Sequence, residues 1–141
     1  MIRRLTALDI DRILEVQEGF TDGWNKDMMH SAFKEDNFFA LGKYEADTLV
    51  GFITVMTALD CADLETVVVK EGFRKQGIAT TLIKSAEDVL KDMGVKNFFL
   101  EVRETNSPAK TTYIRNGFKE ISVRKKYYKD GENAVVMQKE F

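Results

Sequence analysis

The chain has 141 residues, of which 44% are hydrophobic and 31% are charged, and its formal net charge is −2. This length suits a single continuous domain over residues 1–141, and the slight negative charge argues against broad binding to nucleic acid. One cysteine, Cys61, excludes an internal disulfide, and with one histidine, His30, we expect no ordinary metal site. Because there is neither an apolar run of about 20 residues nor a signal-peptide core, we expect a cytoplasmic protein outside the membrane.

The first part of the chain predicts a short strand followed by two helices. Ile2–Leu5 reads as an edge strand, and Thr6 or Asp9 can cap a helix that ends near Gly19. Asn25 can cap a second helix. The apolar side of that helix is predicted to consist of Met28, Met29 and Phe33.

Three strands and a long helix are predicted next. Phe38–Glu45 and Thr48–Ala58 would form a hairpin across the tight turn Ala46-Asp47. Ala62–Val69 is a third long strand, and a helix follows from about Gly77 to Met93. The apolar stripe of this helix is predicted to consist of Ile78, Leu82, Ala86, Val89 or Leu90, and Met93.

The last part of the chain predicts a strand, a short helix and a closing hairpin. Asn97–Arg103 is apolar enough for a central strand buried on both faces, Ser107 can cap the short helix, and Gly117 ends it. The hairpin strands are predicted over Phe118–Lys126 and Ala134–Phe141. The order βααβββαβαββ indicates an α/β fold (α+β, mixed sheet) with helices on both faces and one right-handed parallel crossover.

The most informative segment is Val67–Thr80, VVVKEGFRKQGIAT, where an apolar strand runs into a short charged turn and then a helix. The spacing Arg74-x-x-Gly77-x-Ala79 leaves the first backbone N–H groups of the helix clear of large side chains. Such groups, with the helix dipole, favour phosphate, and Arg74 and Lys75 add positive charge. The pattern is short, so a tight turn without a ligand is the alternative.

Three polar residues beyond this turn are candidates for chemistry. Glu101 lies in a strand expected to be buried, where a carboxylate is costly unless it is paired or functional. The structural alternatives are a salt bridge to Arg103 or a lysine, or a strand end that already reaches solvent. Tyr113 lies on the short helix and could simply be a core aromatic residue. Asn106 stands at the preceding strand-to-helix turn, where capping or a turn hydrogen bond would explain it.

In combination, these motifs resemble the GNAT superfamily of acetyl-CoA-dependent N-acetyltransferases over nearly the whole chain. The resemblance rests on Val67–Thr80, on LEVRETN at 100–106 and on TYIRNGF at 112–118. The last two segments and the tail RKKYYKDGENAVVMQ at 124–138 look like the ribosomal-protein alanine N-acetyltransferases. Thr112 stands where leucine normally precedes the tyrosine, but no departure from the family pattern removes a reacting group.

The resemblance implies an enzyme whose cofactor is acetyl-CoA, with coenzyme A as its product. Glu101 would act as general base toward the acceptor amine, directly or through a water, and Tyr113 as general acid toward the departing thiolate. Asn106 would hydrogen-bond the pantetheine arm. The implied cofactor-binding residues of the strand and turn are Val67, Val68, Val69, Arg74, Lys75, Gln76, Gly77, Ile78, Ala79 and Thr80.

The implied function is transfer of acetyl to the N-terminal α-amine of a protein, in the family a small-subunit ribosomal protein that begins with alanine. Trp24, Tyr127 and Tyr128 could shape the acceptor groove, although the basic surroundings of the tyrosines also fit an exposed hairpin. Two alternatives stay open: acetylation of a small amine (a polyamine, an aminoglycoside or an amino acid), and an acyl-CoA-binding regulatory domain without catalysis. Asp63 and Glu65 could attract any cationic acceptor, so they do not separate the first two functions.

Overall fold

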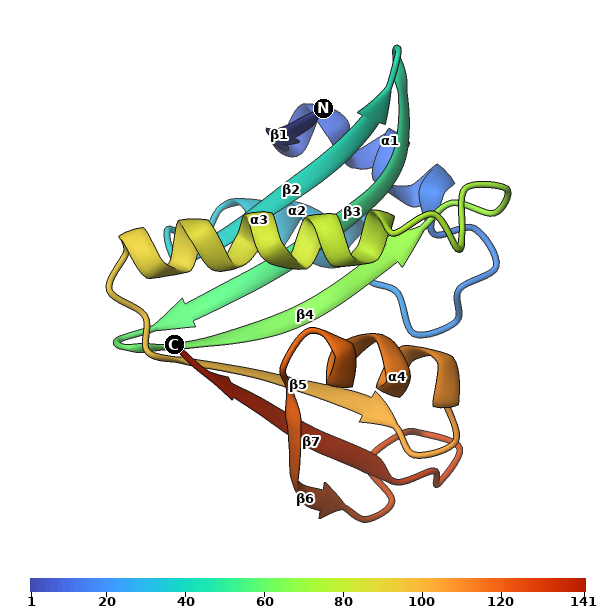
Figure 1. The fold of residues 1–141 in the computed structure, drawn as a ribbon. Helices are drawn as coiled ribbons and strands as arrows, with labels where there is room; N and C mark the ends of the chain where they lie inside the picture. Colours follow the sequence, from blue (N-terminus) through green and yellow to red (C-terminus); the bar gives the residue numbers. More distant parts are fainter.

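The computed structural model describes all of residues 1–141, and its elements follow the predicted order with one added turn of 3-10 helix, η1 (Figure 1). The elements are β1 (Ile2–Arg4), η1 (Ala7–Asp9), α1 (Ile10–Val16), α2 (Lys26–Phe33), β2 (Phe38–Glu45), β3 (Thr48–Ala58), β4 (Cys61–Val69), α3 (Ile78–Asp92), β5 (Asn97–Arg103), α4 (Ser107–Arg115), β6 (Lys119–Arg124) and β7 (Ala134–Glu140). None of the helices combines the length and apolar character needed to cross a bilayer.

Side-chain caps fix the start of most helices. Thr6 and Asp9 form a capping box around η1, so both predicted caps act together. Asn25 caps α2 as predicted. The predicted cap of α4 was wrong by one residue, because the side chain of Asn106, not Ser107, accepts the hydrogen bond of the first turn.

The seven strands form one sheet in the order β1-β2-β3-β4-β5-β7-β6. Only β4 and β5 are parallel, joined by α3, which confirms the predicted crossover. Their pairing runs from Cys61–Leu64 against Asn97–Leu100 and then stops. The carboxyl ends of β4 and β5 therefore separate, as Figure 1 shows. Over the same stretch β3 still pairs with the outer edge of β4, and β7 with the outer edge of β5.

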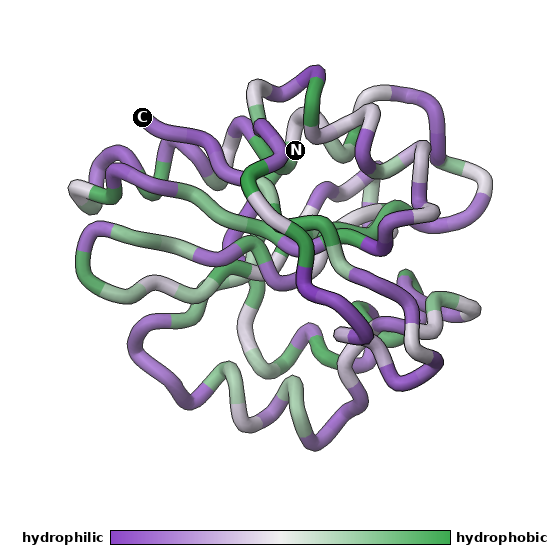
Figure 2. Tube along the Cα trace, turned by 90° about the horizontal axis from the view of Figure 1, so that it is seen from below, coloured by the Kyte–Doolittle hydropathy of each residue, from purple (hydrophilic) through white to green (hydrophobic).

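Helices cover both faces of the sheet, and each face has its own core. Leu82 of α3 and Tyr113 of α4 belong to one buried cluster with Phe98 of the sheet. Ile13 of α1 packs with Phe52 in the second cluster, on the opposite face. In Figure 2 the strands crossing the middle of the molecule are hydrophobic, whereas most peripheral turns are hydrophilic.

Three predictions about burial were wrong. Met28 and Met93 were assigned to apolar stripes, but 47% and 53% of each residue is exposed. Both residues lie at the margin of a buried face, which helical periodicity alone does not resolve. Strand β5 is buried on only one face, since Glu101 on the other face is exposed to a cavity.

Candidate active site

The turn between β4 and α3 presents N–H groups that no side chain caps. The helices η1, α2 and α4 each have a side-chain cap, whereas α3 starts at Gly77 with no side-chain cap and no acidic residue in its first turn. Gly77 has a φ of 79° and Lys75 a φ of 63°, so the backbone turns sharply in the left-handed region. The N–H groups of the first helical turn are therefore open to an anionic ligand such as a phosphate.

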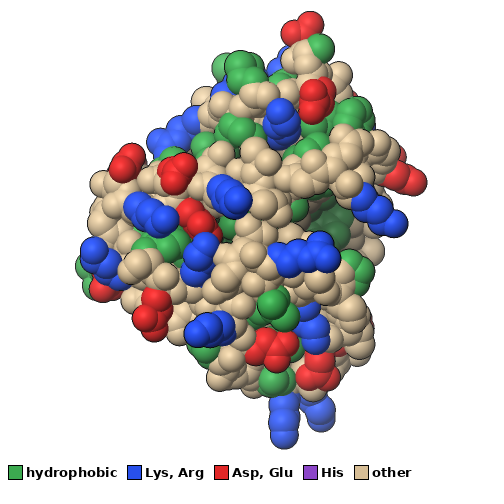
Figure 3. Space-filling view, viewed as in Figure 1, with side chains coloured by type: hydrophobic (Ala, Val, Ile, Leu, Met, Phe, Trp, Pro, Cys, Tyr) green, Lys and Arg blue, Asp and Glu red, His purple; other side chains and the backbone are tan.

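Side chains anchor this turn to both neighbouring elements. Arg74 Nε donates to the carbonyl oxygen of Val69 at 3.0 Å, which holds the turn against the end of β4. Asn116 Nδ2 donates to Thr80 Oγ1 at 3.2 Å, which ties the end of α4 to the first turn of α3. Figure 3 shows a hollow with a hydrophobic floor on this side of the molecule, with Lys or Arg side chains at its rim.

A cavity of 1190 Å³ opens where β4 and β5 separate. Consecutive residues 63–67 of β4 and 99–103 of β5 line it. Because successive side chains of a strand point to opposite faces, a cavity that touches all of them passes through the split in the sheet. It reaches α4 on one side and, on the other, residues 20–25 between α1 and α2 and residues 127–130 before β7.

The structure brings seven of the predicted site residues into the lining of this cavity. They are Trp24, Val67, Glu101, Asn106, Tyr113, Tyr127 and Tyr128. The other predicted cofactor residues, Val68, Val69 and the turn 74–80, lie outside the lining and continue the chain from the end of β4 into α3. The predicted residues thus form two adjoining parts, a turn and a cavity.

Glu101 does not pair with Arg103, which was one structural alternative to a functional role for this carboxylate. Its Oε2 lies 3.8 Å from Arg124 Nε, whereas Arg103 binds other carboxylates. The cause is the strand order: β7 lies between β5 and β6, so Arg124 reaches Glu101 from a strand two places away. The pair is long, and both side chains are accessible, at 61% for Arg124 and 30% for Glu101.

Two further carboxylates lie beside Glu101 in the cavity. Burial, followed by the charges of Asp63 and Glu101, raises the pKa of Glu65 to about 6. Burial and the Glu101 charge also raise the pKa of Asp63, against the opposing charge of Arg124. Three acidic groups thus crowd the mouth of the strand split and favour the approach of a cation.

Tyr113 and Asn106 reach the cavity from the opposite face of the sheet. Only 9% of Tyr113 is exposed, and burial raises the pKa of its hydroxyl well above the ordinary value, so the phenol is protonated at neutral pH. Asn106 Oδ1 accepts a hydrogen bond from the Ala109 N–H at 3.2 Å. Its Nδ2 makes no hydrogen bond within the protein, so capping leaves that group available to a ligand.

A model of the Acetyltransferase (GNAT) family matches residues 8–118 of the chain. The chain belongs to the GNAT family. This GNAT acetyltransferase is 32% identical to a [ribosomal protein bS18]-alanine N-acetyltransferase from Haemophilus ducreyi, and the match covers 97% of each chain. The corresponding enzyme from Haemophilus influenzae is 31% identical over 97% of this chain and 96% of its own.

Solved structures agree with this assignment. The ribosomal-protein-S18-alanine N-acetyltransferase from Escherichia coli superposes with a TM-score of 0.90 at 25% identity, over 98% of this chain and 91% of that one. PaiA N-acetyltransferase from Thermoplasma acidophilum, solved in complex with coenzyme A, shares the fold with a TM-score of 0.77 at 22% identity, over 100% of this chain and 98% of that one. GNAT acetyltransferases use acetyl-CoA as their cofactor.

Sequence analysis missed part of the cavity wall. Asp22 and Arg103 meet there across 81 positions of sequence, and Arg124 approaches Glu101. Asp22 belongs to the segment FTDGWN and Arg103 to LEVRETN. Nothing in either segment indicates that the two charges form a pair. Such pairs can be identified only once the tertiary structure shows which distant residues are neighbours.

Proposed function

We propose that this GNAT acetyltransferase acetylates the N-terminal α-amine of a protein, and that the acceptor is a ribosomal protein that begins with alanine. The names of its relatives from Haemophilus and Escherichia coli support this acceptor. One observation carries the proposal: Glu101 and Tyr113 line the same cavity, one from each face of the split sheet. A proton acceptor and a proton donor on opposite sides of one passage suit a transfer between two substrates that enter from opposite sides.

Acetyl-CoA would supply the acetyl group as an activated thioester. The open N–H groups over Gln76–Thr80 would hold its pyrophosphate, with Arg74 and Lys75 alongside. The edge of Val67–Val69 that β5 leaves unpaired would hydrogen-bond the pantetheine arm as a neighbouring strand does, and Asn106 Nδ2 would add a donor. The fit rests on the uncapped start of α3 and on the strand split.

Two proton movements would accompany the transfer. An N-terminal ammonium, with a reference pKa near ~8, must lose a proton before its nitrogen can attack, and Glu101 would take that proton directly or through a water. The Tyr113 hydroxyl would hold a proton for the departing sulfur. Desolvation raises the pKa of Tyr113 and would raise that of a thiol in the same cavity, which keeps donor and acceptor matched.

The acetyl group would pass directly to the amine. The N–C bond forms as the C–S bond breaks. The ammonium gives its first proton to Glu101 before the attack, and the second proton that the nitrogen loses on becoming an amide passes to solvent. The sulfur takes the proton of Tyr113, which solvent then replaces. Cys61, the only cysteine, does not line the cavity, so no thiol side chain is positioned to carry the acetyl group. The acceptor would contact Trp24, Tyr127 and Tyr128, which line the side of the cavity formed by residues 20–25 and 127–130.

The test is to incubate the protein with acetyl-CoA and either alanine-initiated peptides or a panel of small amines, while following the release of free thiol. Release with peptides alone is the expected result. Release with small amines alone would assign the protein to small-molecule acetylation and overturn the proposal. If no acceptor leads to release of thiol, although acetyl-CoA binds measurably, the protein would be a regulatory domain.

A further inference from the structure

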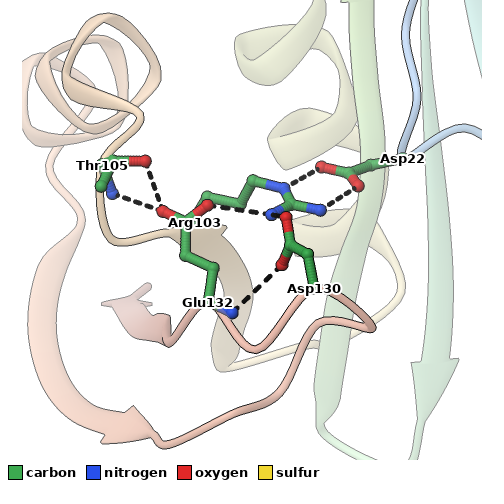
Figure 4. A network of polar contacts seen from close by, with 5 residues as sticks. All are labelled: Asp22, Arg103, Thr105, Asp130 and Glu132. Carbon is green, nitrogen blue, oxygen red and sulfur yellow. Dashed lines mark hydrogen bonds and ion pairs between the residues drawn. The ribbon is translucent and has the colours of Figure 1, made fainter.

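Arg103, at the end of β5, joins three acidic side chains (Figure 4). Its Nε and Nη2 donate to the two carboxylate oxygens of Asp22 at 2.7 and 2.8 Å. Its Nη1 donates to Asp130 at 2.8 Å and to Glu132 at 2.9 Å. The guanidinium also lies over the ring of Tyr128, 4.1 Å from the centroid. The Nε, Nη1 and Nη2 groups of Arg103 each donate at least one hydrogen bond to a carboxylate.

These contacts connect two loops that wall one side of the cavity. Asp22 belongs to residues 20–25, and Asp130 belongs to residues 127–130, all of which line the cavity. The hydrogen bonds that residues 20–25 make to the second half of the chain all go to Arg103. Without Arg103, no hydrogen bond would hold the two loops together.

The cluster also reaches the turn between β5 and α4. Glu132 Oε2 accepts hydrogen bonds from both the N–H and the hydroxyl of Thr105, the residue before Asn106. The hydrogen bonds from Thr105, together with the hydrogen bond from Arg103, lower the pKa of Glu132 to about 2. The pKa of Asp130 is also lowered, mainly by the hydrogen bond that it accepts from the Glu132 N–H. Glu132 and Asp130 therefore carry their negative charges at neutral pH.

We propose that Arg103 is a positioning residue for the acceptor: by clamping residues 20–25 to residues 127–132 it preforms the acceptor wall. This rests on the proposed function, since it takes this end of the cavity as the side where the acceptor enters. Loops that are ordered before binding lose less conformational entropy when the acceptor binds. The clamp should therefore lower the acceptor KM, while the chemical step at Glu101 and Tyr113 proceeds without it.

The test compares R103M, R103K and D22N with the full-length wild type. R103M removes all of the donors, R103K keeps the charge but loses the fork that holds Asp22 at two oxygens, and D22N frees only residues 20–25. We expect the acceptor KM to rise by about tenfold or more in R103M and less in the other two, with kcat and the Kd for acetyl-CoA within about twofold.

The matched control is D11N. Asp11 pairs with Lys26 at 3.2 Å, its side chain is 81% exposed, and neither residue lines the cavity, so all three parameters should stay at wild-type values. An unchanged acceptor KM in R103M, or a fall in kcat alone, would overturn the proposal.

A second measurement separates this inference from the proposed function. If wild type transfers acetyl to no peptide, the proposed function has failed, and amide hydrogen exchange then tests the clamp by itself. Faster exchange over residues 20–25 and 127–133 in R103M than in D11N would support a role for Arg103 in ordering these loops. Equal exchange in the two variants would overturn it.

Discussion

The cofactor turn and the acceptor wall are built in different ways. The turn lies within one stretch, Val67–Thr80, and offers backbone N–H groups at the start of α3. The acceptor wall is assembled from residues 20–25 and residues 127–132, which ion pairs to Arg103 at the end of β5 hold together. A site made of backbone tolerates changes of side chain, whereas a site made of long-range ion pairs depends on single residues.

The largest expected effect lies between these two regions, where the reaction would take place. Glu101→Gln should lower kcat at neutral pH by about 10²–10⁴-fold, because the acceptor ammonium loses its proton acceptor. Part of the activity should return as the pH rises toward the ~8 of a free α-amine. A pH–rate profile measures both the loss at neutral pH and the recovery. The control is E104Q, which changes an exposed glutamate outside the cavity. A wild-type profile in Glu101→Gln would exclude Glu101 as the base.

Tyr113→Phe tests the proton donor and should be next in size. We expect kcat to fall by about 10²-fold while the Kd for acetyl-CoA, measured by calorimetry, stays unchanged. The phenyl ring should keep the packing of Tyr113 against Phe118, whose ring centroid is 6.0 Å away, so the fold should be retained. Wild-type turnover in this variant would mean that Tyr113 is only a core aromatic residue.

Among the binding and kinetic properties, a change in the turn should affect only the affinity for acetyl-CoA. Gly77→Ala puts a side chain on a residue with a φ of 79°, a strain of about 1–2 kcal/mol, and should weaken acetyl-CoA binding by about 5–30-fold. Gly94 is the matched control: it has a φ of 84° at the other end of α3, and a Cβ at either glycine would meet nothing within 4 Å. G94A should therefore lose similar stability without losing affinity for acetyl-CoA. Equal losses of affinity in both variants would contradict a phosphate site at Gly77.

The smallest effect should be a gain of stability when Glu65, a cavity residue of β4, loses its charge. Since the pKa of Glu65 is raised from 4.5 to about 6 in the folded protein, folding favours its protonated form. The free energy of unfolding therefore falls as the pH rises from 4.5 through about 6, and the full cost of the charge is present above that. Glu65→Gln should therefore raise the melting temperature at pH 8 by about 1–3 °C, and the gain should vanish near pH 4. Thermal unfolding at both values checks the sign; a gain confined to acid pH would contradict this account.

The same contrast explains what sequence analysis could predict. The bounds of β2, β3 and β5 match the prediction because alternation and turn residues act over a few neighbours. The uncapped turn at Gly77 was recognisable for the same reason, as its geometry depends on consecutive residues.

The predictions that failed depend on neighbours far away in sequence. A pair between Glu101 and Arg103 was one alternative to a functional Glu101, but the partners of Arg103 come from loops 81 and 27–29 positions away. Glu101 faces Arg124 because β7 is inserted between β5 and β6. Periodicity also could not tell that Met28 and Met93 lie at the margins of buried faces.

The most direct test of the proposed function asks where the acetyl group goes. An alanine-initiated peptide with one internal lysine is incubated with acetyl-CoA and the protein, and fragmentation mass spectrometry locates the acetyl group. We predict one acetyl group on the α-amine of alanine and none on the lysine. Acetyl on the lysine alone, or no acetylated peptide while a small amine is acetylated under the same conditions, would contradict the account.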